Sequence, residues 1–277
     1  MVRLRPVPHR PFNVLTLAVF TIAWCLASAA SAQFTLASLN CLHLGQGSAA
    51  YQANKEAILQ PLFANYDVVV LQEVMRQANL GSVTPGAYNF IVTPVQGPGT
   101  YKEAYAFLVR NAYTVSNNTA TLTNVAGFAR PPAGILLDVG GQWTWIIDYH
   151  AVYGRSISVR RAEVQNIQLV YQGFQTTMVN GVAYPRAVVA GDWNLGANDP
   201  VFQGFVAGGW PISVQPTVQT SLKRNGGLSQ PYDHFLWDTT AVMVTAPQVI
   251  PMPTPPGSDA AWRQQVSDHL GIECTVN

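Results

Sequence analysis

Short runs of apolar residues, separated by Gly- and Pro-rich segments, recur along the chain and predict strands. The predicted strands are residues 34–39, 68–71, 104–110, 134–139, 143–149, 187–190, 234–237 and 272–276. Apolar residues spaced three and four apart predict helices at 49–65 and 159–174. Gly and Pro predict loops at 95–100 and 246–259. Strands interleaved with helices, without an internal repeat, predict one α/β domain in which helices cover the sheets.

The first 32 residues have the pattern of a secretory signal peptide. Arg3, Arg5 and Arg10 precede an apolar run at 14–27, and small residues follow up to Ala32. The apolar run is shorter than the ~20 residues that a membrane-spanning helix needs. We therefore expect cleavage after Ala32, a working domain at 33–277, secretion or a periplasmic location, and no stable membrane association after cleavage.

Composition limits how a polyanionic substrate could bind. Removing the three signal arginines from the 15 Lys and Arg leaves 12, against 14 Asp and Glu, a formal charge of −2. This chain lacks the strong basic excess of many nucleic-acid binders, so a metal and a few arginines would have to hold the substrate. Two cysteines remain, Cys41 and Cys274, and we expect both to be free and buried.

Polar residues stand at the ends of many predicted strands. They are Asn40, Glu73, Glu103, His150, Asp192, Asn194, Asp233, Asp268 and His269. Taken singly, each could be a turn former, a solvated strand end or a structural histidine. In α/β folds, however, the ends of strands carry the chemistry, and the domain has only 14 acidic residues and four histidines.

The residue types at these strand ends indicate which chemistry the site could perform. Asp192 and Asn194 are alternate residues at the end of one strand, so their side chains should share a face. They could shape a turn, or bind a hard cation or a phosphate. Oxygen ligands without cysteine suit Mg²⁺ or Mn²⁺ and not zinc. With histidines and further carboxylates as acid–base groups, the set suggests attack of water on phosphorus.

The motifs LQEV, GDWN, YDH and SDH, in this order, resemble the endonuclease/exonuclease/phosphatase superfamily. The segments YKEAYAFLVR and FARPP are similar to its DNase I-like branch. The resemblance covers nearly all of residues 33–277. It implies a four-layered α/β sandwich, with two packed, mainly antiparallel β-sheets flanked by helices. It also implies a metal-dependent nuclease that cuts DNA, expected to be endonucleolytic, with Mg²⁺ or Mn²⁺ as cofactor and room for a structural Ca²⁺. We expect a monomer by default.

The resemblance also assigns roles to residues. Glu73, Asn40 and Asp268 would bind the cation, and Asp192 and Asn194 would position the attacking water and the scissile phosphate. His150, oriented by Glu103, and His269, oriented by Asp233, would be the acid–base pair, in an order that the pattern leaves open. The substrate contacts would be Arg130 on a phosphate, Tyr101 on the backbone, and Arg76.

The sequence departs from the DNase I pattern at two places. Met75 stands where that branch has an arginine, with Arg76 following it, and the loop after Asn194 lacks the branch's cysteine. Arginines at 155, 160 and 161 fit a solvated helix start, which we favour, or a patch that binds a nucleic-acid backbone. Two other functions stay open: a sphingomyelinase-like phosphodiesterase acting on a lipid or small molecule, and an inactive binding module.

Overall fold

The computed structural model describes residues 33–99, 102–154 and 156–277. The predicted signal peptide, Tyr101 and Arg155 lie outside the described residues. Residues 33–277 form one compact unit. Within the described part of the chain, we find no helix with the length and apolar character to span a membrane.

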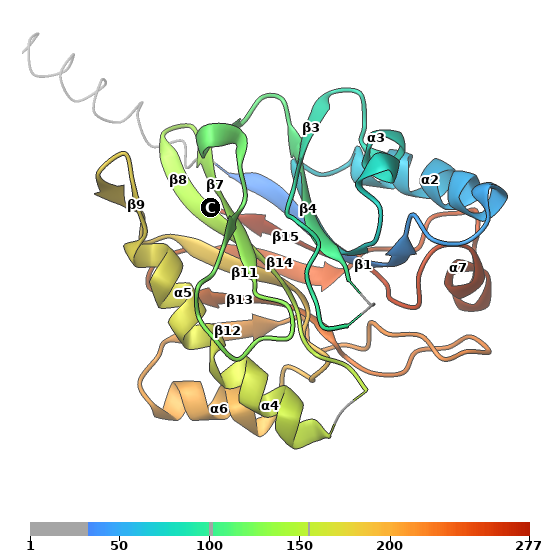
Figure 1. Cartoon of the computed structure of the whole chain (residues 1–277). Helices are drawn as coiled ribbons and strands as arrows, with labels where there is room; N and C mark the ends of the chain where they lie inside the picture. The colour runs from blue at the N-terminus through green and yellow to red at the C-terminus, as the bar shows by residue number, and fades with distance from the viewer. Residues whose placement is uncertain (1–32, 100–101, 155) are drawn as a thin grey trace, which may run out of the picture. The chain divides into compact units, whose positions relative to one another are not determined.

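Two large β-sheets form the centre of this unit (Figure 1). The six-stranded sheet runs in the order β14 (Val244–Val249), β15 (Ile272–Val276), β1 (Phe34–Leu44), β2 (Val68–Val74), β4 (Ala104–Arg110) and β3 (Tyr88–Val92). The second sheet runs β12 (Ile212–Gln215), β13 (Asp233–Asp238), β11 (Ala187–Asp192), β8 (Gln142–His150), β7 (Ala133–Val139) and β5 (Thr114–Val115), with β6 (Thr121–Leu122) also paired to β7.

Each sheet is antiparallel except for one central parallel pair. These pairs are β1 with β2 and β8 with β11. A parallel connection needs a crossover, and helices supply it. Helix α2 (Ala49–Phe63) joins β1 to β2, whereas α4 (Ile157–Gln165) and α5 (Ile167–Thr176) lie between β8 and β11, with the small hairpin β9 (Met178–Val179) and β10 (Val182–Ala183) following them.

Helices cover the outer face of each sheet, which gives the expected four layers. Leu59 of α2, Leu80 of α3 (Leu80–Val83) and Trp262 of α7 (Asp259–Gln265) belong to one apolar core with the first sheet. Val164 of α4, Val170 of α5 and Phe202 of α6 (Pro200–Ala207) belong to a second core with the other sheet. Two single 3₁₀ turns, η1 (Gln77–Asn79) and η2 (Ser116–Asn118), complete the elements. The predicted sandwich fold is confirmed.

Strand alternation directs the polar side chains between the two sheets. Leu39, Leu71 and Tyr149 lie in the outer cores. Because successive side chains of a strand point to opposite faces, their neighbours Asn40 and His150 turn inward. The two sheets therefore present polar groups to each other at one end of their strands.

All eight predicted strands are present, most of them longer than expected. The predicted helix at 159–174 is wrong as a single element: it divides at Asn166 into α4 and α5, since the turn there ends one helix and begins the next. The loop expected from residue 246 is also wrong at its start, because β14 continues to Val249 with a bulge between Thr245 and Gln248. Both remaining cysteines are free and buried, as expected.

Candidate active site

Strand ends from both sheets meet at one cavity of about 920 Å³. In the second sheet, Asp192 is paired in register with His150 on one side and with Asp233 on the other. In the first sheet, Asn40 is paired with Gln72, which precedes Glu73. The predicted site residues that line the cavity are Asn40, Glu73, Arg130, His150, Asp192, Asn194, Asp268 and His269. The structure therefore brings together most of the predicted residues, and Glu103 and Asp233 lie directly behind the two histidines.

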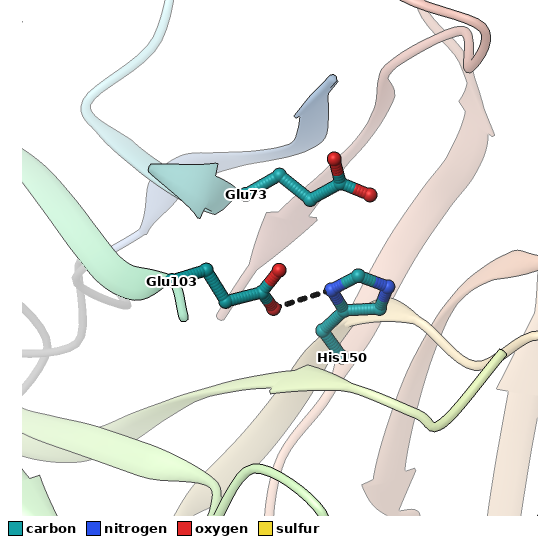
Figure 2. A group of neighbouring side chains, drawn as sticks. All are labelled: Glu73, Glu103 and His150. Carbon is teal, nitrogen blue, oxygen red and sulfur yellow. Dashed lines mark hydrogen bonds and ion pairs between the residues drawn. The ribbon is translucent and has the colours of Figure 1, made fainter. Parts of the chain in front are cut away.

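His150 is fixed by Glu103 on the side away from Asp192. Figure 2 shows the Glu103 carboxylate pointing at the imidazole ring, with Oε1 2.6 Å from His150 Nδ1. Both side chains are buried. Burial opposes a charge on His150, but the Glu103 carboxylate outweighs it and raises the pKa of His150. Burial alone would raise the pKa of Glu103, whereas His150 and Arg130 lower it, so the two shifts favour the charged form of the pair.

His269 has a matching partner on the opposite side of the cavity. Its Nδ1 lies 2.8 Å from Asp233 Oδ2, and the ring is buried. Burial opposes protonation here as well, yet Asp233 and Asp192 raise the pKa of His269 well above its ordinary value. The site therefore holds two imidazoles, each with one nitrogen bound to a carboxylate and the other nitrogen turned inward.

Asp192 lies between the two inward nitrogens. Its Oδ2 is 3.6 Å from His150 Nε2 and 3.5 Å from His269 Nε2, and it accepts a 3.1 Å hydrogen bond from Asn40 Nδ2. Burial raises the pKa of Asp192 and the two imidazolium groups oppose that rise. Its Oδ1 accepts the backbone N–H of Asn194 at 2.9 Å, so the turn and the site suggested by the sequence coexist at this strand end.

On the first sheet, Glu73 presents its carboxylate to the cavity beside Asn40, whose Oδ1 accepts the backbone N–H of Leu42 at 2.9 Å. Asn40 Nδ2 donates to Glu73 Oε1 at 3.1 Å, and one ligand atom each of Glu73, Glu103 and His150 lie within 4.8 Å of one another. Glu103 Oε2 and Asp233 Oδ1 are buried without a hydrogen-bond partner among the described residues. Buried carboxylates with unsatisfied oxygens fit a hard divalent cation, which would supply the missing positive charge.

Backbone strain is concentrated at this cavity. Leu42, His43, Glu73 and Asn194 line it and all have positive φ values, between 40° and 58°. Such conformations cost free energy in residues other than glycine, and they gather at functional sites. Glycine is required at Gly191, because a Cβ there would lie 1.9 Å from the carbonyl oxygen of Tyr149. This close approach places Asp192 beside β8.

Three predicted contacts differ from expectation. Asp268 lines the cavity, but its carboxylate lies 3.3 Å from Arg263 Nη1. It belongs neither to the group of Glu73, Glu103 and His150 nor to the group of Asp192, Asp233 and His269. Arg130 is buried and bound to Glu103 at 3.1 Å and to the carbonyl of Ala151 at 2.7 Å. Arg130 therefore lines the cavity and also holds the backbone at His150 and Ala151, where β8 ends. Arg76 does not line the cavity.

Arg160 and Arg161, on α4, are both bound to partners within the protein. Arg160 donates to the backbone carbonyl of Asn194 at 2.7 Å. Arg161 makes a bidentate pair with Asp199, the N-cap residue of α6. These bonds fasten α4 to the loop that follows β11. The start of α4 is exposed at residues 156–159 and half-buried at these two arginines, so it is solvated as the sequence favoured, but Arg160 and Arg161 have partners.

His43 and Glu163 are among the cavity-lining residues that sequence reasoning missed. His43 lies 3.2 Å from Glu73 through its Nε2, and its signal was only a histidine three residues after Asn40. Glu163 on α4 is buried and accepts the backbone N–H groups of Ala129 and Val152. An acidic residue in the middle of an amphipathic helix gave no sign that it would hold two loops.

Comparison with known proteins agrees with this geometry. A family model described as "Endonuclease/Exonuclease/phosphatase family" matches residues 37–269. A protein named deoxyribonuclease from Thioalkalivibrio sp. (strain K90mix) is 26% identical over 270 residues, which cover 89% of this chain and 72% of that protein.

Solved structures share the fold at low sequence identity. The endonuclease/exonuclease/phosphatase from Bacteroides vulgatus superposes with a TM-score of 0.64 at 14% identity, covering 88% of this chain and 98% of that one. The structure of D. rerio TDP2 complexed with single strand DNA product gives a TM-score of 0.61 at 18% identity, covering 89% and 100%. At these identities the likeness establishes the fold alone.

Proposed function

The chain belongs to the endonuclease/exonuclease/phosphatase family, whose members are divalent-metal-dependent hydrolases of phosphodiester bonds, and we propose that it is a secreted nuclease that cuts DNA endonucleolytically. Its relative from Thioalkalivibrio, named deoxyribonuclease, supports DNA as the substrate. The basic and apolar residues before Ala32 support export. We propose Mg²⁺ or Mn²⁺ as the cofactor.

The observation that carries this proposal is the position of Asp192 between two histidines. One oxygen of Asp192 lies within 3.6 Å of both His150 Nε2 and His269 Nε2, and each ring is bound to a carboxylate from behind. A phosphate in the cavity would have a proton donor and a proton acceptor on either side. Such fixed acid–base groups in a buried site suit hydrolysis of a phosphodiester.

The residues of this chain account for the proton transfers. The oxygen of water bonds to phosphorus, and the bond between phosphorus and the leaving oxygen breaks. The water's proton goes to Asp192 or to one imidazole, and the leaving oxygen takes a proton from an imidazolium. The carboxylates of Glu103 and Asp233 keep the rings oriented and raise the pKa values of both, so an imidazolium is available near neutral pH.

A divalent cation fits the first-sheet side of the cavity. Glu73 and Asn40 would hold it, and the carboxylate of Glu103, one oxygen of which is unpartnered, belongs to the same group as Glu73. The cation would act as a Lewis acid that offsets the charge developing on the phosphate oxygens. Asp268, bound to Arg263, would take part from a greater distance.

Nicking of supercoiled plasmid by the purified protein tests the proposal. We expect open-circular product with Mg²⁺ or Mn²⁺, none with EDTA, and a loss of about 10²-fold or more in His150→Ala, because one of the two acid–base groups is gone. Asp138→Asn, prepared in the same way, is the matched control: Asp138 caps the turn between β7 and β8 through Gly141. Full activity in His150→Ala would contradict the assignment of His150 to the reaction.

A second candidate is hydrolysis of a lipid or small-molecule phosphodiester. Tyr153 and Val159 line the cavity and are exposed, so its mouth is partly apolar. Apolar side chains at a mouth favour a substrate with an apolar group. Vesicles of sphingomyelin, given to the same preparation, separate the candidates: release of phosphocholine with intact plasmid would replace DNA by the lipid as substrate.

A further inference from the structure

His43 lies beside Glu73, the carboxylate proposed above to bind the cation. Its Nε2 lies 3.2 Å from Glu73 Oε2, and its backbone N–H donates to the same oxygen at 3.1 Å. The imidazole lines the cavity and is 39% exposed, so a cation from solvent can reach it. His43 takes no part in the proton transfers proposed above.

The backbone that presents His43 is built for this position. Leu42 and His43 are consecutive residues with positive φ, where β1 loses its regular register with β2. The buried Lys55 holds this segment by donating to the carbonyls of Cys41 and Leu42, both at 2.8 Å. Positive φ at two residues and burial of Lys55 both cost free energy of folding, which a His43 side chain that only faced solvent would not require.

The spacing of the two side chains matches joint coordination. Two ligand atoms at right angles around one ion, each about 2.1 Å from it, are about 3 Å apart. Glu73 Oε2 and His43 Nε2, at 3.2 Å, already have this separation. A cation bound by Glu73 on the cavity side would therefore meet an imidazole nitrogen.

We propose that His43 is an additional ligand of the cation held by Glu73 and Asn40, and that it makes the site selective for a first-row transition-metal ion, Mn²⁺ over Mg²⁺. The inference rests on the cation site of the proposed function. Imidazole nitrogen is a ligand of transition-metal ions, whereas Mg²⁺ is held by carboxylate, carbonyl and water oxygens. The nitrogen thus adds affinity for Mn²⁺ and little for Mg²⁺.

Metal binding without substrate tests the inference. Isothermal titration calorimetry would give the Mn²⁺ and Mg²⁺ affinities of the wild-type protein and of His43→Asn, since asparagine tolerates positive φ and has no imidazole. We expect the variant to lose about tenfold or more in Mn²⁺ affinity, and its Mg²⁺ affinity to stay nearly unchanged. Pulsed electron paramagnetic resonance of bound Mn²⁺ should show ¹⁴N coupling from imidazole in the wild type and none in the variant.

His43→Gly, which also accepts the backbone conformation, is a second variant for the case that His43→Asn does not fold. A Mn²⁺ to Mg²⁺ affinity ratio that is the same in all three proteins, or ¹⁴N coupling that persists without His43, would overturn the inference. Failure of the proposed function has a different signature: His43-dependent Mn²⁺ binding in a protein that nicks no plasmid keeps His43 as a ligand and removes DNA as the substrate.

Discussion

Asn40 and Asp192, 152 residues apart in the chain, share a hydrogen bond of 3.1 Å from Asn40 Nδ2 to Asp192 Oδ2. Asn40 belongs to β1 of the first sheet and Asp192 to β11 of the second. The proposed cation ligands of one sheet and the proposed acid–base groups of the other therefore meet across the space between the sheets. Packing of the two inner faces fixes this distance, because a close-packed interior is hardly compressible.

Asp192→Asn should abolish most of the activity without unfolding the protein. The carboxamide presents an N–H₂ group or a neutral oxygen where Oδ2 now faces Asn40 and the two imidazoles. The negative charge is lost in both orientations, and the N–H₂ orientation removes the acceptor as well. We expect kcat for plasmid nicking to fall about 10²-fold or more. Activity within a few-fold of the wild type, with Asp138→Asn as the control for preparation, would remove Asp192 from the reaction.

Glu103→Gln should lower the pKa of His150. Burial by itself lowers that pKa, and the Glu103 carboxylate reverses the effect. A neutral amide at this position leaves burial and Arg130 to lower the pKa of His150 against the Asp192 carboxylate alone. Nuclear magnetic resonance titration of the His150 ring protons in EDTA measures the pKa directly. If protonated His150 serves the reaction, the alkaline limb of the pH–rate profile should move to lower pH with it.

An unchanged pKa of His150 in Glu103→Gln would contradict this electrostatic account. Asp233→Asn is the matched comparison, because it removes the corresponding carboxylate from His269. It should lower the pKa of His269 and leave that of His150 nearly in place.

Sequence patterns predicted the central strands because buried strands are continuous apolar runs, such as residues 68–71. They missed β12 and β14, which pair on one side only and are half-exposed, so polar residues interrupt their apolar pattern. The motif residues could be found because their types and order are specific. His43 could not, since its place beside Glu73 depends on a strained bend in β1 that no local signal announces.

Contacts made by long side chains were equally hidden from the sequence. Arg130 carries the charge expected of a phosphate ligand, but its guanidinium lies against Glu103 and the carbonyl oxygens of residues 150 and 151. The partner of a flexible arginine is set by the tertiary position of several segments. The motifs therefore predicted the two histidine–carboxylate pairs but not the partners of the arginine side chains.

Glu163→Gln should weaken substrate binding more than it slows the chemical step. Glu163 Oε2 accepts the N–H of Ala129, and Oε1 accepts the N–H of Val152 and the hydroxyl of Tyr149. Glutamine keeps one acceptor oxygen, so one of the two loops beside Arg130 and His150 loses its anchor. We expect KM for plasmid DNA to rise on the order of tenfold, with a smaller change in kcat.

Glu273→Gln is the control for Glu163→Gln, because Glu273 makes an exposed contact with Gln248 away from the cavity. Equal KM values for wild type and both variants would show that Glu163 does not position the loops. A fall in kcat as large as the change in KM would instead place it in the reaction.

The stability conferred by His269 should decline as the pH rises. Its pKa in the folded protein lies well above 6.5, the ordinary value that we take for the unfolded chain, because Asp233 and Asp192 outweigh burial. Folding therefore favours the protonated ring. This contribution is fully present below about pH 6.5 and is lost as the pH rises through the folded-state pKa.

Thermal unfolding of wild type and His269→Gln in EDTA, from about pH 5 to 10, should show the largest difference in Tm at the acidic end. Asp233→Asn should flatten this trend, since it removes the charge that raises the pKa. A difference in Tm that stays constant or grows with pH would mean that His269 is held in the neutral form.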